Sequence, residues 1–190
     1  MAQSSIRFAT AKIKMKQASS VSQNDIARLS EAVTFNEALQ VLVDIGFLSG
    51  DNRDYDFAVD RYVSNACNLV NKFTTDENLS KAMLLKFDGH NLKVLLKSRL
   101  LNIEPDHLYN CGTIAVDKLK HAVANHNYSV LPTKLKHCLQ HLEKEIVTNF
   151  DPLKIDVEID KAVYSVIFDF IKNLNNKTIT NYFTKQVTFL

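Results

Sequence analysis

The sequence predicts an all-α protein. Only four glycines and three prolines occur in 190 residues, whereas a β-rich fold normally needs many more of these turn-forming residues. Apolar residues recur every three or four positions through much of the chain, which places them on one face of a helix. Hydrophobic residues make up 46% and charged residues 23% of the chain, as is typical of a folded globular protein. Long helices joined by few tight turns are therefore expected.

Capping signals mark the helices expected at the start of the chain. Residues 4–18 have a modest apolar periodicity that predicts a first helix. Residues 22–25 and 34–37 each place a hydroxyl three positions before a carboxylate, a pattern that satisfies free amide groups where a helix begins. Gly46 follows the second of these signals and predicts the end of a short helix there.

Two longer helices are expected next. Residues 55–73 have aromatic and aliphatic side chains at three- and four-residue intervals, which predicts a helix with one buried face. Residues 74–76 predict the N-cap of the following helix, which is expected to run to about Leu101. One stripe of this following helix is formed by Leu84, Phe87, Asn91, Val94, Leu95, Ser98 and Leu101.

The second half of the chain shows a similar organisation after an irregular stretch. A proline and a glycine fall within residues 102–112, which we interpret as the junction between two domains. Helices are expected over residues 113–124, 131–147 and 155–174, and the last of these has the strongest helical periodicity in the protein. A polar turn at residues 175–178 leads to a final segment.

A polar pair interrupts the apolar stripe of the helix that ends near Leu101. Asn91 lies on the buried side, where an amide is costly unless its hydrogen bonds are satisfied. Asp88 lies one turn earlier on nearly the same side. We therefore expect this pair to clamp a neighbouring helix end or turn. Leu92 and Lys93 follow Asn91 directly, so the structural motif, Asp88, Asn91, Leu92 and Lys93, has the form D-x-x-N-L-K.

The D-x-x-N-L-K pattern of these four residues resembles the signature of the C subunit of archaeal and bacterial V-type (A-type) ATPases, which is related to subunit d of the eukaryotic V-ATPase. Two further segments support the resemblance. Residues 34–47 are similar to the family's early S-x-x-E-A-L … L-x-D-T-x-Y segment, although residues 45–47 replace its usual ending. Residues 156–164 resemble the family's I-D-x-x-L-D-K-x-Y-F passage. The resemblance covers essentially the whole chain.

The resemblance also implies a domain organisation. Family members are built from three similar all-helical bundle domains arranged as a funnel, and this sequence resembles the first two. The implied domains are residues 1–101 and residues 102–190, the second cut short at its C-terminal end. An internal repeat supports this division, since residues 29–33 are echoed by residues 119–123. The chain is therefore expected to be a fragment that lacks the third domain.

The function implied by the resemblance is that of a non-catalytic central-stalk subunit of a rotary V-type ATPase or ATP synthase. Such a subunit couples the stalk to the membrane rotor ring during H⁺ or Na⁺ transport, so its implied partners are the other central-stalk subunits and the ring. The implied location is the cytoplasm, peripheral to the membrane through the complex. No segment has the roughly 20 apolar residues that a transmembrane helix needs. A net charge of +2 does not indicate a nucleic-acid partner.

Sequence motifs of catalysis and cofactor binding are missing from the chain. It has neither a P-loop nor a G-x-G-x-x-G fingerprint, so it cannot be the subunit that hydrolyses ATP. Cys67, Cys111 and Cys138 form no C-x-x-C pair, which predicts free thiols in a reducing compartment. We therefore expect no enzymatic activity, no cofactor and no metal ion.

Two alternative functions stay open. The first is a helical regulatory module that binds protein or nucleic acid, for which basic and aromatic residues would have to gather on one face. The second is a metal-dependent helical enzyme, which rests on His137 and His141, four positions apart on one predicted helix. Cys138 and Glu145 are close to them in the sequence, but we expect these histidines to lie on a solvated helix face.

Overall fold

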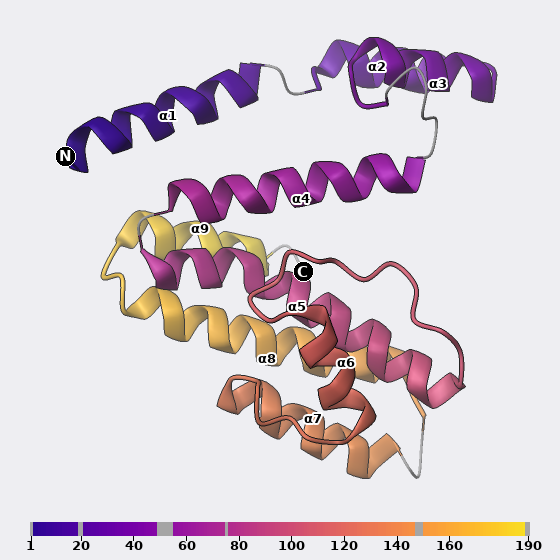
Figure 1. The fold of residues 1–190 in the computed structure, drawn as a ribbon, viewed down its shortest axis with the longest axis vertical. Helices are drawn as coiled ribbons and strands as arrows, with labels where there is room; N and C mark the ends of the chain where they lie inside the picture. The colour runs from indigo at the N-terminus through magenta and orange to yellow at the C-terminus, as the bar shows by residue number, and fades with distance from the viewer. Residues whose placement is uncertain (1, 19–20, 49–54, 75, 147–149, 189–190) are drawn as a thin grey trace. The chain divides into compact units, whose positions relative to one another are not determined.

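The computed structural model describes residues 2–18, 21–48, 55–74, 76–146 and 150–188 (Figure 1). Within these ranges the chain is largely helical and contains no β-strand, which confirms the predicted all-α fold. None of the helices in the described ranges is long and apolar enough to cross a membrane. In chain order, the helices are α1 (Ala2–Ala18), α2 (Gln23–Glu31), α3 (Phe35–Asp44), α4 (Tyr55–Phe73), α5 (Glu77–Leu101), α6 (Val116–Ala124), α7 (Thr133–Ile146), α8 (Pro152–Lys172) and α9 (Lys177–Thr188).

The chain forms two compact units, Met1–Asn65 and Ala66–Leu190, and the boundary between them lies inside helix α4. The domains expected from the sequence are residues 1–101 and 102–190, so their boundary lies after α5. The boundary between the two compact units lies before α5, which belongs entirely to the second unit. Those domains rest on the irregular stretch at residues 102–112 and on the family resemblance, with the internal repeat as support, and they stay a prediction.

In the first unit, helices α2 and α3 form a pair in which both starts are capped as expected. The Ser22 side chain accepts a hydrogen bond from the backbone amide of Asp25, and the Asp25 carboxylate accepts one from the amide of Ser22. Thr34 and Glu37 repeat this arrangement at α3. Gly46, with a φ of +72°, follows the end of α3. A small core in this unit consists of Leu39, Leu48 and Ala58, with Leu42, Val43 and Phe47 packed against it.

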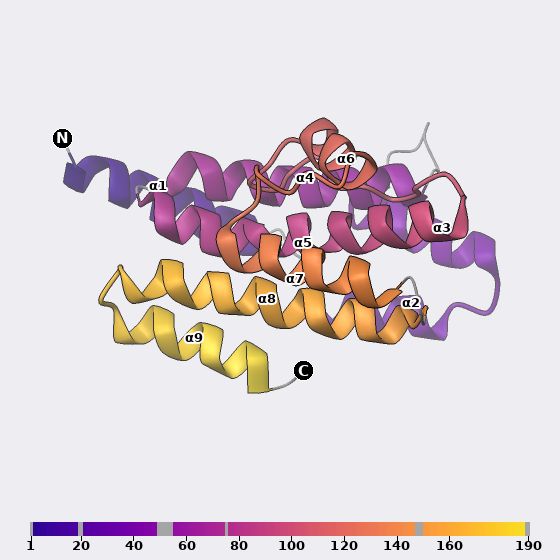
Figure 2. The same cartoon turned by 90° about the horizontal axis from the view of Figure 1, so that it is seen from below.

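The second unit is organised around helices α5 and α8, which run antiparallel and side by side (Figures 1 and 2). Helix α6 packs against α5, whereas α7 and α9 pack against α8. The two central helices approach closely at Gly89, where an added Cβ atom would lie 2.6 Å from Cγ2 of Val163. Glycine therefore allows the close contact of these helices. The fully buried core includes Leu85, Leu92, Leu96, Leu119, Leu135, Leu139, Leu142, Ile155 and Ile159.

Two details of these central helices differ from the expectation. Helix α8 begins at Pro152, before the expected start at residue 155, because the side chain of Asp151 caps the helix there and Pro152 suits its first position. The Asp151 carboxylate accepts hydrogen bonds from the backbone amides of Leu153 and Lys154, and proline suits the first position of a helix. Leu101 is 53% exposed rather than buried with its stripe, because it is the last residue of α5.

Candidate functional site

Asp88, on α5, is fully buried and holds the segment that leads into α6. Its Oδ2 atom accepts hydrogen bonds from the backbone amide and the hydroxyl of Thr113, at 2.8 and 2.5 Å, and its Oδ1 atom accepts one from the amide of Ile114 at 3.2 Å. Burial raises the pKa of Asp88, and the hydrogen bonds from Thr113 and Ile114 oppose that rise. Thr113 and Ile114, which Asp88 binds, precede α6, and this helix begins at Val116 rather than at residue 113 as expected.

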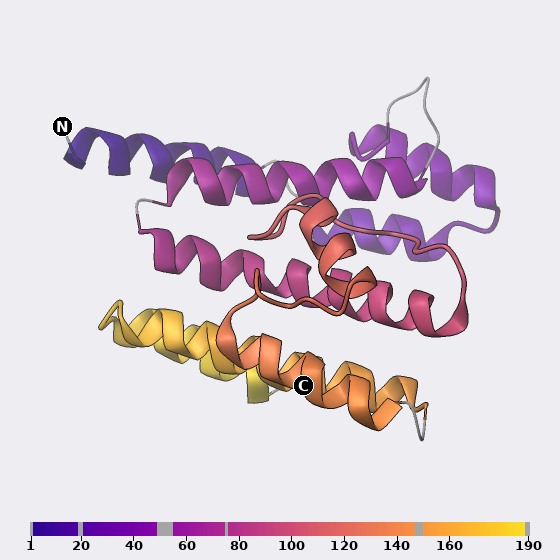
Figure 3. The ribbon, with the colours of Figure 1, turned by 60° about the horizontal axis from the view of Figure 1, so that its bottom comes forward.

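Asn91 binds the connection between α5 and α6, residues 103–114, which we term the strap. The Asn91 Nδ2 atom donates a hydrogen bond to the carbonyl oxygen of Tyr109 at 2.8 Å. The backbone amide of Tyr109 donates one to Oδ1 of Asn91 at 2.9 Å. The amide side chain, 0% exposed, thus satisfies both backbone groups of one strap residue. The strap runs back over α5 from its C-terminal end (Figures 1 and 3).

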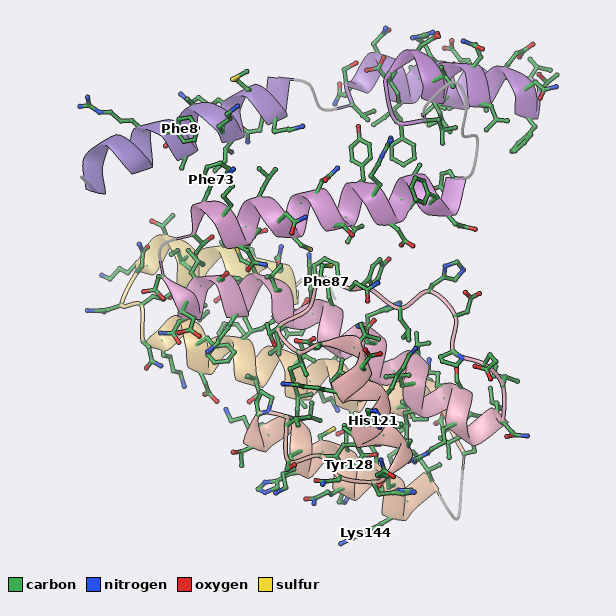
Figure 4. The ribbon with its side chains drawn as sticks, viewed as in Figure 1. Phe8, Phe73, Phe87, His121, Tyr128 and Lys144 are labelled. Carbon is green, nitrogen blue, oxygen red and sulfur yellow. The ribbon has the colours of Figure 1, made fainter. Side chains whose placement is uncertain are left out.

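Aromatic rings extend the contact between α5 and the strap. The ring of Phe87, which is labelled on α5 in Figure 4, meets the ring of Tyr109 edge to face, with 5.3 Å between their centroids. The centroid of the His90 ring lies 4.8 Å from that of Tyr109. The carbonyl oxygen of His107 accepts a hydrogen bond from Nε2 of His90 at 3.0 Å. Four residues of α5 therefore contact the strap, namely Phe87, Asp88, His90 and Asn91.

The other two residues of the motif have different neighbours. Leu92 is 0% exposed and lies in the core of the second unit. The Nζ atom of Lys93 lies 2.8 Å from Oδ1 of Asp160 on α8, and one turn further on Lys97 makes a second ion pair, with Asp156, at 2.6 Å. The motif thus joins α5 to the strap, to the core and to α8, which is an arrangement that can hold helices in place.

A second polar group, which no sequence motif reveals, joins α5 to α7. Arg99 donates a hydrogen bond to Oε1 of Glu143 at 2.5 Å and another to the carbonyl oxygen of Val123. The hydroxyl of Tyr128, labelled in Figure 4, donates to the same Oε1 atom at 2.5 Å, and Nδ1 of His126 lies 2.9 Å from it. Arg99 and Glu143 are 44 positions apart, so no local spacing could have indicated this group.

This environment shifts the pKa values of two of its members. Burial alone would raise the pKa of Glu143, but hydrogen bonds from Tyr128, His126 and Arg99 outweigh burial and lower it below 4.5. Burial, with the hydrogen bond to Glu143, raises the pKa of Tyr128. The carboxylate is therefore the acceptor and the phenol the donor at neutral pH.

The lowered pKa of Glu143 predicts a pH dependence of stability. The unfolded chain binds a proton at this position more readily than the folded protein does, so the stabilisation is present above pH 4.5 and is lost as the pH falls through the lower, folded value. In Glu143→Gln, the free energy of unfolding should fall less steeply over this acid range, as measured by urea denaturation at a series of pH values. Glu104→Gln alters an exposed carboxylate and serves as the control. Equal slopes in wild type and Glu143→Gln would contradict the prediction.

The candidate metal ligands on α7 form no larger cluster in the part of the chain that the structure describes. His137 and His141 are exposed, and Nδ1 of His141 lies 3.4 Å from Oε2 of Glu145. Within the described ranges, no three side chains of histidine, cysteine, aspartate or glutamate are placed to hold a metal ion. Cys138 donates a hydrogen bond to the carbonyl oxygen of Glu158 at 3.3 Å. Burial, with the charge of Glu158, raises the pKa of Cys138 to about 11, so this thiol stays protonated at neutral pH.

Comparison with known proteins gives one finding. Residues 9–189 match a protein-family model described as ATP synthase (C/AC39) subunit. The match spans the whole of the second unit except its last residue, and it includes the motif on α5. No curated protein and no solved structure gives a match.

Proposed function

This chain belongs to the ATP synthase (C/AC39) subunit family, and from that premise we propose that it acts as a non-catalytic central-stalk subunit of a rotary V-type ATPase or ATP synthase. In this role it couples the central stalk to the membrane rotor ring during H⁺ or Na⁺ transport. Its partners are then the other stalk subunits and the ring, and it lies in the cytoplasm, peripheral to the membrane through the complex. The observation that carries the proposal is the family match over residues 9–189.

The packing of α5 supports this mechanical role. A part that transmits rotation needs elements that keep their positions under load, and it needs no reacting groups. Helix α5 has 25 residues, a length of about 38 Å. Along that length it is attached to the strap by Asp88 and Asn91 and to α8 by Lys93 and Lys97. Both sets of contacts lie on the same rigid helix, so a force applied to one is passed to the other.

Affinity purification tests the proposal. We expect the tagged chain, expressed in its own host and recovered from detergent-solubilised membranes, to bring down central-stalk and rotor-ring subunits that mass spectrometry identifies. An untagged copy of the chain, added in excess, should compete for them. Recovery of a folded chain with no ATPase subunit would contradict the proposal. Recovery in a complex that nuclease or moderate salt dissolves would favour the nucleic-acid-binding alternative.

A further inference from the structure

A pocket of about 240 Å³ lies between the C-terminal end of α5, the start of the strap and α6. Its apolar walls are formed by Leu95, Ile103, Pro105, Val123 and Ala124. Sites for cofactors and other small molecules usually measure about 300–1,000 Å³. The pocket is smaller than these and has room for about one large side chain.

Ser98 gives the wall of this pocket one polar group. Ser98 lines the pocket and is only 6% exposed. Its backbone carbonyl accepts a hydrogen bond from the amide of Ile103, but in the described part of the chain its hydroxyl has no partner. In the described part of the chain the Ser98 Oγ atom is not a buried group without a partner, because solvent still reaches it. A ligand that places a hydrogen-bonding atom beside Ser98 would take the place of that solvent.

Two charged residues of opposite sign stand at the rim of the pocket. Lys120 and Glu104 both line it, and within the described ranges neither forms an ion pair. Arg99 also lines the pocket, but its guanidinium is held by Glu143 and by the carbonyl oxygen of Val123. The rim therefore offers one unpaired cation and one unpaired anion.

One exposed apolar side chain forms part of the pocket wall, and a second lies two positions before it in the chain. Ile103 forms part of the pocket wall and is 58% exposed, and Leu101, two positions earlier, is 53% exposed. Exposed apolar side chains around a pocket are typical of a site where another protein docks.

We propose that this pocket receives a large apolar side chain from a segment of a partner protein, and that the segment carries one acidic and one basic residue beside this anchor. The volume fits one side chain rather than an acyl chain or a cofactor, and the mixed charges of the rim favour a peptide over an anionic lipid surface. The segment's backbone supplies a hydrogen bond to Ser98, its acidic residue pairs with Lys120, and its basic residue pairs with Glu104. This inference goes beyond the proposed function and rests on the surface alone.

A titration followed by ¹⁵N nuclear magnetic resonance tests the inference on the full chain. The probe is a capped peptide with the sequence glutamate, alanine, phenylalanine, alanine, lysine. We expect chemical-shift changes concentrated at Ser98, Ile103 and Val123, with a dissociation constant on the order of 1 mM. A peptide with serine in place of phenylalanine should bind about tenfold more weakly or not at all, because it lacks the anchor.

Two variants locate the binding site. Ala124 is exposed at the end of α6 and lines the pocket, so Ala124→Trp should fill the pocket without disturbing the core and should weaken binding by about tenfold. Ala115→Trp places the same bulk on an exposed alanine at the other end of α6 and should bind the peptide as the wild type does. Equal binding by both variants, or shift changes that lie elsewhere on the chain, would overturn the proposal.

Charge reversal tests the rim. In Lys120→Glu both rim charges are negative, so this variant should prefer a peptide with lysine on both sides of the phenylalanine over the original peptide. An unchanged preference would overturn the assignment of the rim. Binding of phosphatidylserine vesicles that survives Ala124→Trp, with no binding of the peptide, would show a lipid surface instead and would also overturn the proposal.

Discussion

Replacing Asn91 with leucine is expected to lower the free energy of unfolding by about 2–4 kcal/mol. Leucine fills a similar space and is a good helix former, so neither a cavity nor helix propensity accounts for the loss. The loss comes from Tyr109, whose carbonyl oxygen and amide would both lose the partner that Asn91 now provides at 2.8 and 2.9 Å. Asn91 is 0% exposed, so water does not replace that partner unless the strap moves away from α5.

Urea denaturation followed by circular dichroism measures this effect. Asn181→Leu is a matched control, since Asn181 lies on α9 in the same unit, is exposed and forms no side-chain hydrogen bond within the described ranges. The control should stay within about 0.5 kcal/mol of the wild type. A stability of Asn91→Leu equal to that of the control would show that the amide does not hold the strap.

The second large effect is expected at Gly112 on the strap. A Cβ atom there would lie 1.9 Å from Oδ1 of Asp88 and 2.7 Å from its Cγ, far inside normal contact. The carboxylate cannot swing aside without losing its hydrogen bonds to Thr113 and Ile114. Gly112→Ala should therefore destabilise the protein by about 2–4 kcal/mol.

A double-mutant cycle separates this clash from a general effect of alanine on the strap. Asp88→Ala removes the carboxylate that the new Cβ atom would meet. In that background, Gly112→Ala should cost less than about 1 kcal/mol, which gives a coupling energy of about 2 kcal/mol between the two positions. Additive losses would mean that Gly112 is needed for another reason.

The helix positions could be predicted well because their signals are local. The caps at Ser22, Thr34 and Asp76 are each set by residues within one turn, and each begins the helix that was expected. The family resemblance was also local, since it rested on short motifs, and the match over residues 9–189 confirms it. The predicted start of α6 was wrong, since α6 begins at Val116 after an N-cap alanine that makes no side-chain cap hydrogen bond, so no local capping signal marks it.

The partners of the polar residues could not be predicted. Asp88 and Asn91 could be recognised as a pair that needs hydrogen-bond partners, because both are polar groups on an apolar stripe. Nothing in the sequence identified Thr113 and Tyr109 as those partners. The partner of Lys93 lies 67 positions away on another helix. Such pairings depend on how helices pack, and helix packing is decided by the shapes of whole surfaces rather than by spacing.

The two ion pairs between α5 and α8 also fix how these helices are aligned along their length. Lys93 meets Asp160 and Lys97 meets Asp156, so residue numbers rise on one helix as they fall on the other. If the helices slipped by one turn, in either direction, only one of the two lysines would still lie opposite a carboxylate. Gly89 would at the same time move away from Val163, whose side chain occupies the space that a Cβ atom at position 89 would need. The two ion pairs and the close approach at Gly89 therefore oppose sliding of α5 along α8.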